Sequence, residues 1–398
     1  MRNPAEDPMK ENDDVSHHSH PTAQPEPAAD PFARLADALD RLPNGYPRTE
    51  SGIELLILRK IFTAKEAAVG RLMRGEPEPF EEIAVRAGAS VDAMRAGASV
   101  DAVRRILKGM AKKGLVWPSK GDGKLRYRLA PFIVGIYEAS LPILDHELAH
   151  LVEDYLAQGG IKGIMKPQPA LHRVVPARGT AKTEWILPYD DVKAIIMAAK
   201  SFQVRDCICR VEQDLLGKRT CTAPVHNCLG FSAFERPARP DDISQARALA
   251  ILDQAEEAGL VHTVSNVMEG VSYVCNCCGC CCGILRGVTE YGIKESVARA
   301  NYLSTIDATA CTGCGVCVDR CQVGAITVRD AAGGPVHVVT ADACIGCGLC
   351  VSGCAAGAAT LSLRPDAERI SPPSTYADWE KARMGNRGPL DHEHRIGD

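Results

Sequence analysis

The sequence predicts a multidomain α+β protein in which an N-terminal half without cysteines precedes a cysteine-rich C-terminal half. Three observations support this prediction. All eighteen cysteines lie after residue 206. One cysteine motif occurs twice near the C-terminus, followed each time by similar residues, which indicates a duplicated half-domain. Between residues 34 and 134 the pattern is typical of several helices followed by a β-hairpin.

The bulk composition excludes several classes of protein. The chain has 398 residues, a formal net charge of −4 and 45% hydrophobic residues, which is ordinary for globular domains. The small net charge implies no strong overall attraction to nucleic acid or membrane. We expect no membrane span and a cytoplasmic location, because we find neither an apolar run of about 18 residues nor a signal-peptide core. Disulfides are disfavoured in the cytoplasm, so the cysteines are expected to be metal-binding or catalytic.

Shifts in composition divide the chain into six ranges. We expect a disordered tail at 1–33, a helical and hairpin domain at 34–134, an α/β connecting region at 135–205, a cysteine-rich α/β region at 206–300, the duplicated unit at 301–364 and an extended tail at 365–398. The first range contains too few large apolar residues to order itself.

The range 34–134 contains three helix-like runs and a hairpin signal. The last helix is predicted over Val100–Lys113, where apolar residues recur at helical spacing. Gly121-Asp122-Gly123 marks the turn of a hairpin between Trp117 and Leu129. This order of elements resembles the winged-helix variant of the helix-turn-helix.

The winged-helix resemblance leads to a DNA-binding hypothesis. Between Val100 and Leu129 nine basic residues stand against two acidic ones, the pattern expected for contact with phosphates. The nine are Arg104, Arg105, Lys108, Lys112, Lys113, Lys120, Lys124, Arg126 and Arg128. The alternative is a structural or dimerisation module with a solvated basic face. A near-repeat, Ala87–Arg95 and Ala96–Arg104, lengthens the turn before the last helix and weakens the DNA-binding hypothesis.

His146, Glu147 and His150 form an H-E-x-x-H motif, in which two histidines one helical turn apart can hold zinc. The apolar stripe of the same helix, which includes Leu148 and Leu151, lies on the opposite face. We therefore expect an exposed helix face here, with a zinc protease site as the alternative.

Strand-like and helix-like runs alternate before and between the first cysteines. Strands are predicted at Leu171–Val175, Glu184–Leu187 and Phe202–Arg205, and helices at Tyr189–Lys200 and Asp242–Ala258. These runs predict an α/β arrangement for the connecting and cysteine-rich regions.

Ten cysteines between residues 207 and 282 are candidate ligands of further metal clusters. They are Cys207, Cys209, Cys221, Cys228, Cys275, Cys277, Cys278, Cys280, Cys281 and Cys282. Four thiolates saturate a zinc ion or a 4Fe–4S cluster, so ten suffice for two sites with two left over. We expect one or two further iron–sulfur clusters, with zinc as the alternative. The first four cysteines are expected near the 275–282 loop, and the ligand grouping stays open.

The duplicated motif is C-x2-C-x2-C-x3-C, the thiolate spacing that holds an iron–sulfur cluster. It occurs at Cys311–Cys321 and again, 33 residues later, at Cys344–Cys354. The matching runs Gly324–Val328 and Gly357–Leu361 extend the repeat. On these motifs, residues 301–364 resemble bacterial two-cluster ferredoxins.

The ferredoxin resemblance implies a β-α-β repeat with two 4Fe–4S clusters. In that family the fourth cysteine of each motif binds the other cluster. Carried over, the first cluster takes Cys311, Cys314, Cys317 and Cys354, and the second takes Cys344, Cys347, Cys350 and Cys321. The family usually has proline after each fourth cysteine, where this chain has Gln322 and Ala355. We expect this departure to alter potential or stability more than ligation.

Three functions follow from these patterns. The first is an iron–sulfur protein that relays single electrons between redox partner proteins, as a component of an oxidoreductase system. The second is a regulator whose DNA binding responds to cluster state. The third is a reductase whose active site is a cluster of the middle region. The sequence identifies no catalytic residue.

Overall fold

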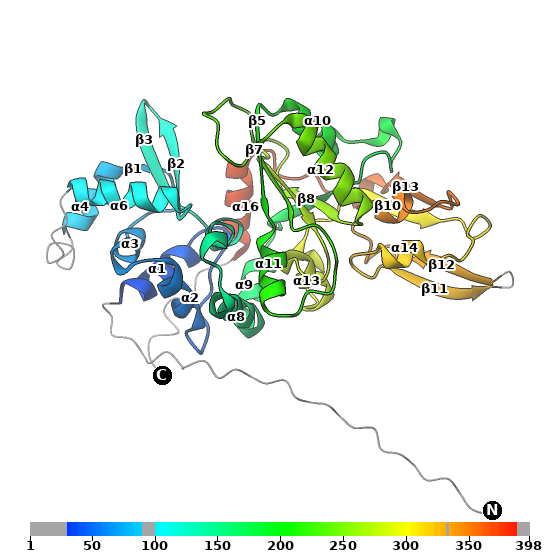
Figure 1. Ribbon diagram of the computed structural model, residues 1–398, viewed down its shortest axis with the longest axis horizontal. Helices are drawn as coiled ribbons and strands as arrows, with labels where there is room; N and C mark the ends of the chain where they lie inside the picture. Colours follow the sequence, from blue (N-terminus) through cyan, green and yellow to red (C-terminus); the bar gives the residue numbers. More distant parts are fainter. Residues whose placement is uncertain (1–29, 90–99, 332–333, 388–398) are drawn as a thin grey trace, which may run out of the picture.

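The computed structural model describes residues 30–89, 100–331 and 334–387. Figure 1 shows helices and a small sheet of the N-terminal part at one end, a larger sheet with its helices in the middle, and the C-terminal strands at the other end. The predicted disordered tail, 1–33, lies outside the described residues as far as residue 29, and the prediction is wrong for residues 31–33, which begin a helix. Most of the near-repeat, at residues 90–99, also lies outside them.

Within residues 30–89 and 100–112, five helices form the N-terminal part: α1 (Pro31–Asp40), α2 (Ile53–Ile61), α3 (Ala64–Gly70), α4 (Phe80–Ala89) and α6 (Val100–Lys112). Helix α1 begins at Pro31 because the Asp30 carboxylate accepts a hydrogen bond from the Phe32 amide, which caps the helix. Buried Leu35, Leu58 and Leu107 bring α1, α2 and α6 into one core.

The predicted hairpin is confirmed. Strand β2 (Val116–Gly121) pairs with β3 (Lys124–Leu129) around a turn in which Asp122 and Gly123 have positive φ angles, and β1 (Glu78–Pro79) adds the third strand. Three of the nine basic residues form ion pairs, Lys113 with Glu66, Arg126 with Asp122 and Arg128 with Glu380. The other six, Arg104, Arg105, Lys108, Lys112, Lys120 and Lys124, are exposed.

A run of short helical segments leads from the hairpin to the middle part: η1 (Phe132–Ile136), α7 (Tyr137–Ala139), η2 (Leu141–Ile143), α8 (His146–Tyr155), η3 (Leu156–Gly160) and α9 (Ile161–Met165). Helix α8 packs against α2 and against α11 (Ile208–Leu215). It therefore joins the N-terminal helices to the cysteine-rich region.

The middle part is built on one antiparallel sheet of order β4-β8-β9-β6-β5-β7. Its strands are β4 (His172–Val175), β5 (Ser201–Asp206), β6 (His226–Ser232), β7 (Asp242–Ile243), β8 (Val261–Ser265) and β9 (Tyr273–Cys277). The ranges 135–205 and 206–300 thus contribute to the same sheet. Helices α10 (Val192–Ala198) and α12 (Gln245–Glu257) pack together over a core that includes Phe202, Ile251 and Val264. Helix α13 (Gly283–Thr289) follows the cysteine loop, before η6 (Lys294–Ser296).

The strand predicted at Glu184–Leu187 is wrong. The structure has two short 3-10 helices there, η4 (Thr183–Trp185) and η5 (Pro188–Asp190). The Leu187 amide donates a hydrogen bond to the Tyr302 hydroxyl (3.0 Å) rather than to a neighbouring strand. Proline at 188 has no amide hydrogen to extend a ladder, so the apolar run has no strand partner.

The C-terminal strands form two antiparallel pairs. Strand β10 (Tyr302–Ile306) pairs with β13 (Ala359–Leu363), and β11 (Ile326–Ala331) pairs with β12 (Gly334–Val339). The short helices α14 (Val316–Asp319) and α15 (Leu349–Ser352) occupy equivalent places in the two motifs. Each contains the third cysteine of its motif. Each half therefore runs strand, helix, strand.

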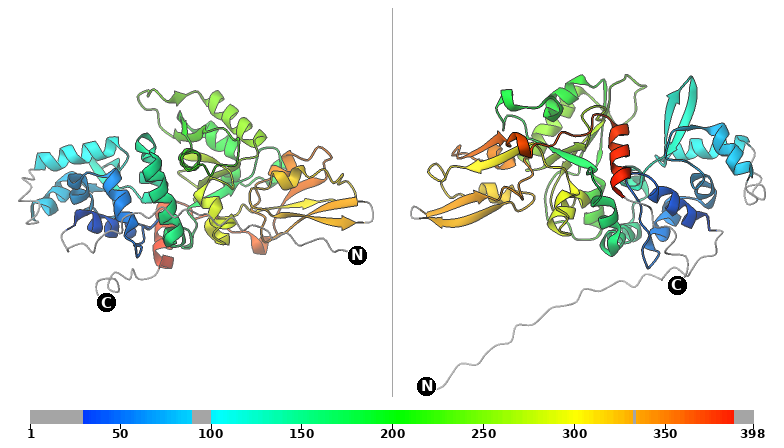
Figure 2. Two further views of the ribbon diagram at one scale, coloured as in Figure 1. Left: turned by 60° about the horizontal axis from the view of Figure 1, so that its bottom comes forward. Right: turned by 180° about the vertical axis from the view of Figure 1, so that it is seen from behind.

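The extended tail predicted after Pro365 is wrong for residues 376–387. After η7 (Asp366–Glu368) the chain forms helix α16 (Tyr376–Arg387), which returns to the N-terminal helices (Figure 2). Trp379 donates to the Ala170 carbonyl (2.9 Å), and Arg383 donates to the carbonyls of Pro43 (2.8 Å) and Pro169. These partners are distant in the sequence, so local polarity does not reveal the helix. Among the described helices, none is both long and apolar enough to cross a membrane.

Candidate metal centres

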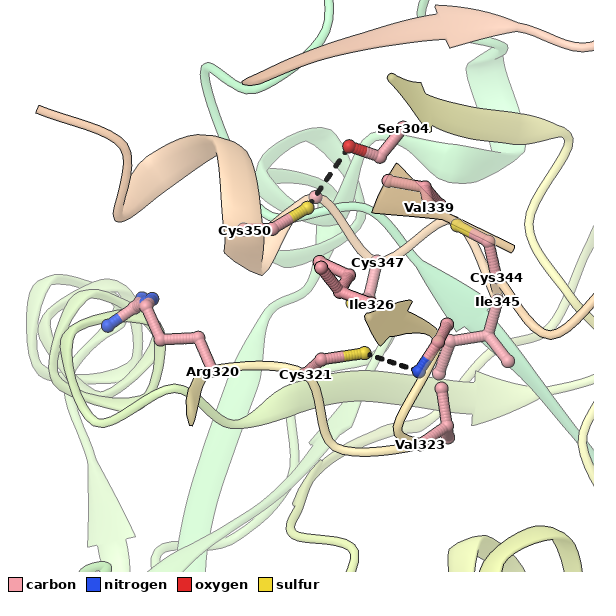
Figure 3. Close-up of a pocket in the computed structure, with 12 residues that line it drawn as sticks. Ser304, Arg320, Cys321, Val323, Ile326, Val339, Cys344, Ile345, Cys347 and Cys350 are labelled. Carbon is pink, nitrogen blue, oxygen red and sulfur yellow. Dashed lines mark hydrogen bonds between the residues drawn. The ribbon is translucent and has the colours of Figure 1, made fainter. Parts of the chain in front are cut away.

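Four cysteines line one cavity in the C-terminal part: Cys321, Cys344, Cys347 and Cys350 (Figure 3). The cavity has a volume of about 350 Å³, including space open to solvent. The Ala325 amide donates to the Cys321 sulfur (3.1 Å), and the Cys350 thiol donates to the Ser304 hydroxyl (3.1 Å). Three cysteines of the second motif and the fourth cysteine of the first motif therefore meet at one place.

Of the remaining cysteines of the two motifs, Cys311, Cys314 and Cys317 lie near one another. Cys311 and Cys314 lie close enough to Cys317 to raise its pKa, after the larger effect of burial. The Ala359 amide donates to the Cys354 sulfur (3.4 Å), as Ala325 does to Cys321. Amide-to-sulfur hydrogen bonds of this kind stabilise thiolate ligands and tune a cluster's potential.

Burial determines the protonation of two of the cavity cysteines, Cys347 and Cys350. It raises the pKa of Cys350 to about 11 and also raises the pKa of Cys347. Without bound metal these groups are neutral thiols at neutral pH. A metal cluster would stabilise the thiolates, and its binding would release protons.

The ten cysteines of the middle part form two groups. The first, called here the four-cysteine site, is Cys221, Cys278, Cys280 and Cys281, whose sulfurs all lie within 4.8 Å of one another. The contacts from Cys221 are 3.7 Å to Cys278 and 4.0 Å to Cys281, and Cys280 lies 3.5 Å from Cys281. A hydrogen bond between Cys281 and Cys278 lowers the pKa of Cys278 and raises that of Cys281.

The other six cysteines line a second cavity, called here the six-cysteine chamber, which encloses about 860 Å³ including space open to solvent. Their side chains form a continuous run of contacts in the order Cys207, Cys209, Cys282, Cys277, Cys275 and Cys228. Cys278 and Cys281 of the four-cysteine site also border this cavity. The first four cysteines of the region are thus divided, because Cys221 belongs to one group and the other three to the chamber.

Polar groups on the wall of the chamber have unused hydrogen-bonding capacity. Four buried atoms there have no hydrogen-bond partner among the described residues: His172 Nε2, Arg210 Nε, Glu212 Oε1 and Asn227 Nδ2. Each of these residues is at most 3% exposed. Buried polar atoms are nearly always paired, so these four atoms would suit a polar or charged group bound in the chamber.

The charged groups around the chamber favour the binding of an anion. Arg210 lies beside Cys207, Cys277 and Cys278 and is completely buried. Burial raises the pKa of Glu212 to about 8, and Tyr137 donates a hydrogen bond to this carboxyl group. A carboxyl group that is protonated at neutral pH adds no negative charge beside the thiolates.

Comparison with known families identifies the C-terminal cysteine sites. Residues 310–358 match the family model of the 4Fe-4S dicluster domain. This domain binds 4Fe–4S clusters and implies iron–sulfur electron transfer. No curated protein and no solved structure matches the chain.

The dicluster domain docks directly on the loop that carries the four-cysteine site. The Gly279 amide donates to Gln322 Oε1 (2.8 Å), and Gln322 Nε2 donates to the Gly259 carbonyl (2.8 Å). An added Cβ at Gly279 would lie 2.2 Å from the Gln322 carbonyl oxygen, so only glycine fits this contact. Gln322, which stands where the ferredoxin family usually has proline, therefore links Cys321 to the middle cysteines.

Arg320 strengthens the same interface. Its guanidinium donates to the carbonyls of Glu256 (2.6 Å) and Glu257 (3.0 Å) at the end of α12, and to Leu349 (2.9 Å) in the dicluster domain. The cysteine spacing does not predict the positions of Arg320 and Arg210 at these sites. Arg210 directly follows Cys207-Ile208-Cys209, and that adjacency is the sequence signal that could have indicated its position.

The H-E-x-x-H motif lies on an outward face of α8. His146 and Glu147 are exposed, and Glu147 pairs with Lys60. The two imidazoles contact each other at 4.4 Å between ring centroids. Among the described residues, the four-cysteine site is the one group of three or more side chains arranged to hold a metal ion, so no third ligand accompanies His146 and His150. This arrangement gives no support to a protease site.

Proposed function

We propose that the protein is an iron–sulfur electron-transfer protein that relays single electrons through two 4Fe–4S clusters of the dicluster domain into an iron–sulfur centre in the six-cysteine chamber. The contact between Gln322 and Gly279 carries this proposal. It joins the residue after Cys321 to the loop between Cys278 and Cys280. A protein that used the dicluster domain only to meet soluble partners would have no need of this internal contact.

The two clusters of the dicluster domain follow the crossed ligation that the ferredoxin resemblance implies. Cys321, Cys344, Cys347 and Cys350 hold the cluster nearer the interface, since they line one cavity. Cys311, Cys314, Cys317 and Cys354 hold the other, and Cys314 is exposed to solvent. An exposed ligand lets a partner protein approach, so the second cluster receives electrons from an external donor.

The six-cysteine chamber receives the electrons. Its thiols surround a cavity, as the cysteines of the dicluster domain do, and its unpaired donors can bind the sulfides of an anionic cluster. The chamber offers two more thiols than a single 4Fe–4S cluster requires. Partner proteins act as donor and final acceptor.

Anaerobic iron and acid-labile sulfide analysis, with EPR after reduction by dithionite, tests this proposal. Three clusters correspond to about 12 irons per chain. A Cys209→Ser/Cys282→Ser variant should lose the iron bound in the chamber and keep the two EPR signals of the dicluster domain. About eight irons in both proteins would remove the chamber from the relay, and fewer than six in the wild type would overturn the relay itself.

A second function is favoured by one observation. Six basic side chains on α6 and the β2–β3 hairpin are exposed on the helix-and-hairpin unit, which we interpret as a winged helix. A DNA-binding regulator would use this face. A gel-shift assay at low salt tests it, with a Lys108→Glu/Lys112→Glu variant as control. Absence of retardation for the holo and the metal-free wild type would exclude the regulator.

A further inference from the structure

The spacing of the sulfurs in the four-cysteine site differs from that of the dicluster cysteines. All four sulfurs lie within 4.8 Å of one another, and the shortest contacts are between 3.5 and 4.0 Å. Across the described residues no set of dicluster cysteines is arranged so closely. The two kinds of site therefore differ in the size of the group that fits between the thiols.

A single tetrahedral ion accounts for the close spacing. With zinc–sulfur bonds of about 2.3 Å, the edge of the tetrahedron is about 3.8 Å. A 4Fe–4S cluster places a separate iron behind each thiolate, so its four ligands lie farther apart than those of one ion. The dicluster cysteines, which belong to a family that binds such clusters, serve as an internal reference.

Two arginines lie beside such a site and offset part of its charge. Arg219 lies beside Cys221, and its Nε donates to the Cys221 carbonyl (2.9 Å). Arg210 lies beside Cys278. Four thiolates and one divalent ion carry a net charge of about −2. The two guanidinium groups offset part of this charge, since Arg219 is also paired with Asp214 (2.7 Å).

We propose that Cys221, Cys278, Cys280 and Cys281 bind one zinc ion, and that this ion fixes the docking loop of the dicluster domain. Sulfur ligands in a closed tetrahedral set are typical of structural zinc, and zinc binds such sites more tightly than ferrous iron does. The ion ties the loop before β6, which carries Cys221, to the loop after β9. Gly279 lies between two of the ligands, so the ion holds its amide toward Gln322.

The proposal is independent of the electron relay, because zinc has no redox chemistry of its own. A relay without zinc, or zinc without a relay, is a distinct experimental outcome. The zinc site makes the contact between Gly279 and Gln322 rigid, and it leaves all six chamber cysteines for the iron–sulfur centre.

Metal analysis and zinc-edge X-ray absorption of the anaerobically purified full-length protein test the proposal. We expect about one zinc per chain, surrounded by four sulfurs at about 2.3 Å. Nitrogen or oxygen ligands at the zinc, or a single iron with the same sulfur environment, would overturn the assignment. This measurement needs no variant.

A pair of variants separates the two middle sites. Cys280→Ser should lower the zinc content several-fold and leave the EPR signals of the iron clusters in place, whereas the control Cys228→Ser should lower the iron content and keep the zinc. Loss of about four irons from Cys280→Ser, with zinc absent from the wild type, would show that the four-cysteine site holds a cluster. If Cys280→Ser does not fold, the wild type can be produced in cobalt-containing medium to test whether the four-cysteine site binds a single ion. Visible bands of tetrahedral cobalt thiolate support the site, and their absence from cobalt-loaded protein contradicts it.

Discussion

Replacement of Gly279 by alanine tests the contact on which the proposed electron relay depends. An added Cβ would lie 2.2 Å from the Gln322 carbonyl oxygen, which is backbone and cannot rotate away. The loop or the dicluster domain must therefore shift by more than 1 Å to reach an ordinary contact of about 3.4 Å or more. Such overpacking costs about 1–3 kcal/mol.

The shift also breaks hydrogen bonds at the interface. The bonds from the Gly279 amide to Gln322 and from Gln322 to Gly259 contribute about 1 kcal/mol each. Together with the overpacking the loss is about 3–5 kcal/mol, which changes the ratio of docked to undocked domain by roughly 150–5,000-fold. We expect the rate of electron transfer from the dicluster domain to the chamber to fall within this range.

Flash reduction followed by freeze-quench EPR measures that rate, because the signals of the dicluster domain decay as the signal of the chamber grows. Gly283→Ala is the matched control, at the first residue of α13 directly after the cysteine loop. Its added Cβ would lie 3.9 Å from Leu156, an ordinary van der Waals contact. Equal rates for Gly279→Ala and Gly283→Ala would refute the role of the Gln322 contact.

Three further predictions concern stability and the interface. Glu153 is buried against Arg286, and although burial opposes ionisation, Arg286 and Lys218 lower the pKa of Glu153 to about 2. Its contribution to the free energy of unfolding is therefore complete above about pH 4.5 and is lost as the pH falls toward 2. Glu153→Gln should cost about 3–5 kcal/mol in urea denaturation at pH 7, against less than about 1 kcal/mol for the half-exposed Glu290→Gln, and equal costs would contradict this reasoning. Arg383→Met should release α16 from the N-terminal helices. Limited proteolysis should then cut after Thr375 several times faster than in the control Lys381→Met, which changes an exposed residue. Unchanged cleavage would show that Arg383 does not hold the helix in place. Gln322→Pro, which restores the residue usual in ferredoxins, should leave the iron content unchanged and slow electron transfer as Gly279→Ala does. Iron loss would show that residue 322 supports the cluster itself.

Local sequence patterns predicted most elements that depend on neighbouring residues. The hairpin at Trp117–Leu129 follows from its Gly-Asp-Gly turn, and the helix at Val100–Lys112 from its apolar spacing. The turn residues lie within the hairpin, and the apolar residues lie within the helix that they predict. The paired cysteine motifs likewise indicated the dicluster domain, because the thiolate spacing is a local requirement of the cluster.

Features that depend on distant partners could not be predicted in this way. Helix α16 has few apolar residues, and its buried Trp379 and Arg383 bind carbonyls more than 200 residues away in the chain. The run Glu184–Leu187 resembles a strand but lacks a partner strand. The grouping of the middle cysteines required the structure for the same reason, since Cys221 meets a loop that begins 57 residues later.

Reduction of the chamber in a Cys321→Ser variant tests the central claim most directly. Cys321 lines the cavity nearest the interface, and Gln322 beside it contacts Gly279. The account predicts that serine at 321 damages this cluster, leaves the iron of the chamber in place and slows the reduction of the chamber by the external donor at least tenfold, which corresponds to about 1.4 kcal/mol or more in the barrier. A chamber signal that appears at the wild-type rate would contradict the relay, because electrons would then enter the middle part without passing through the dicluster domain.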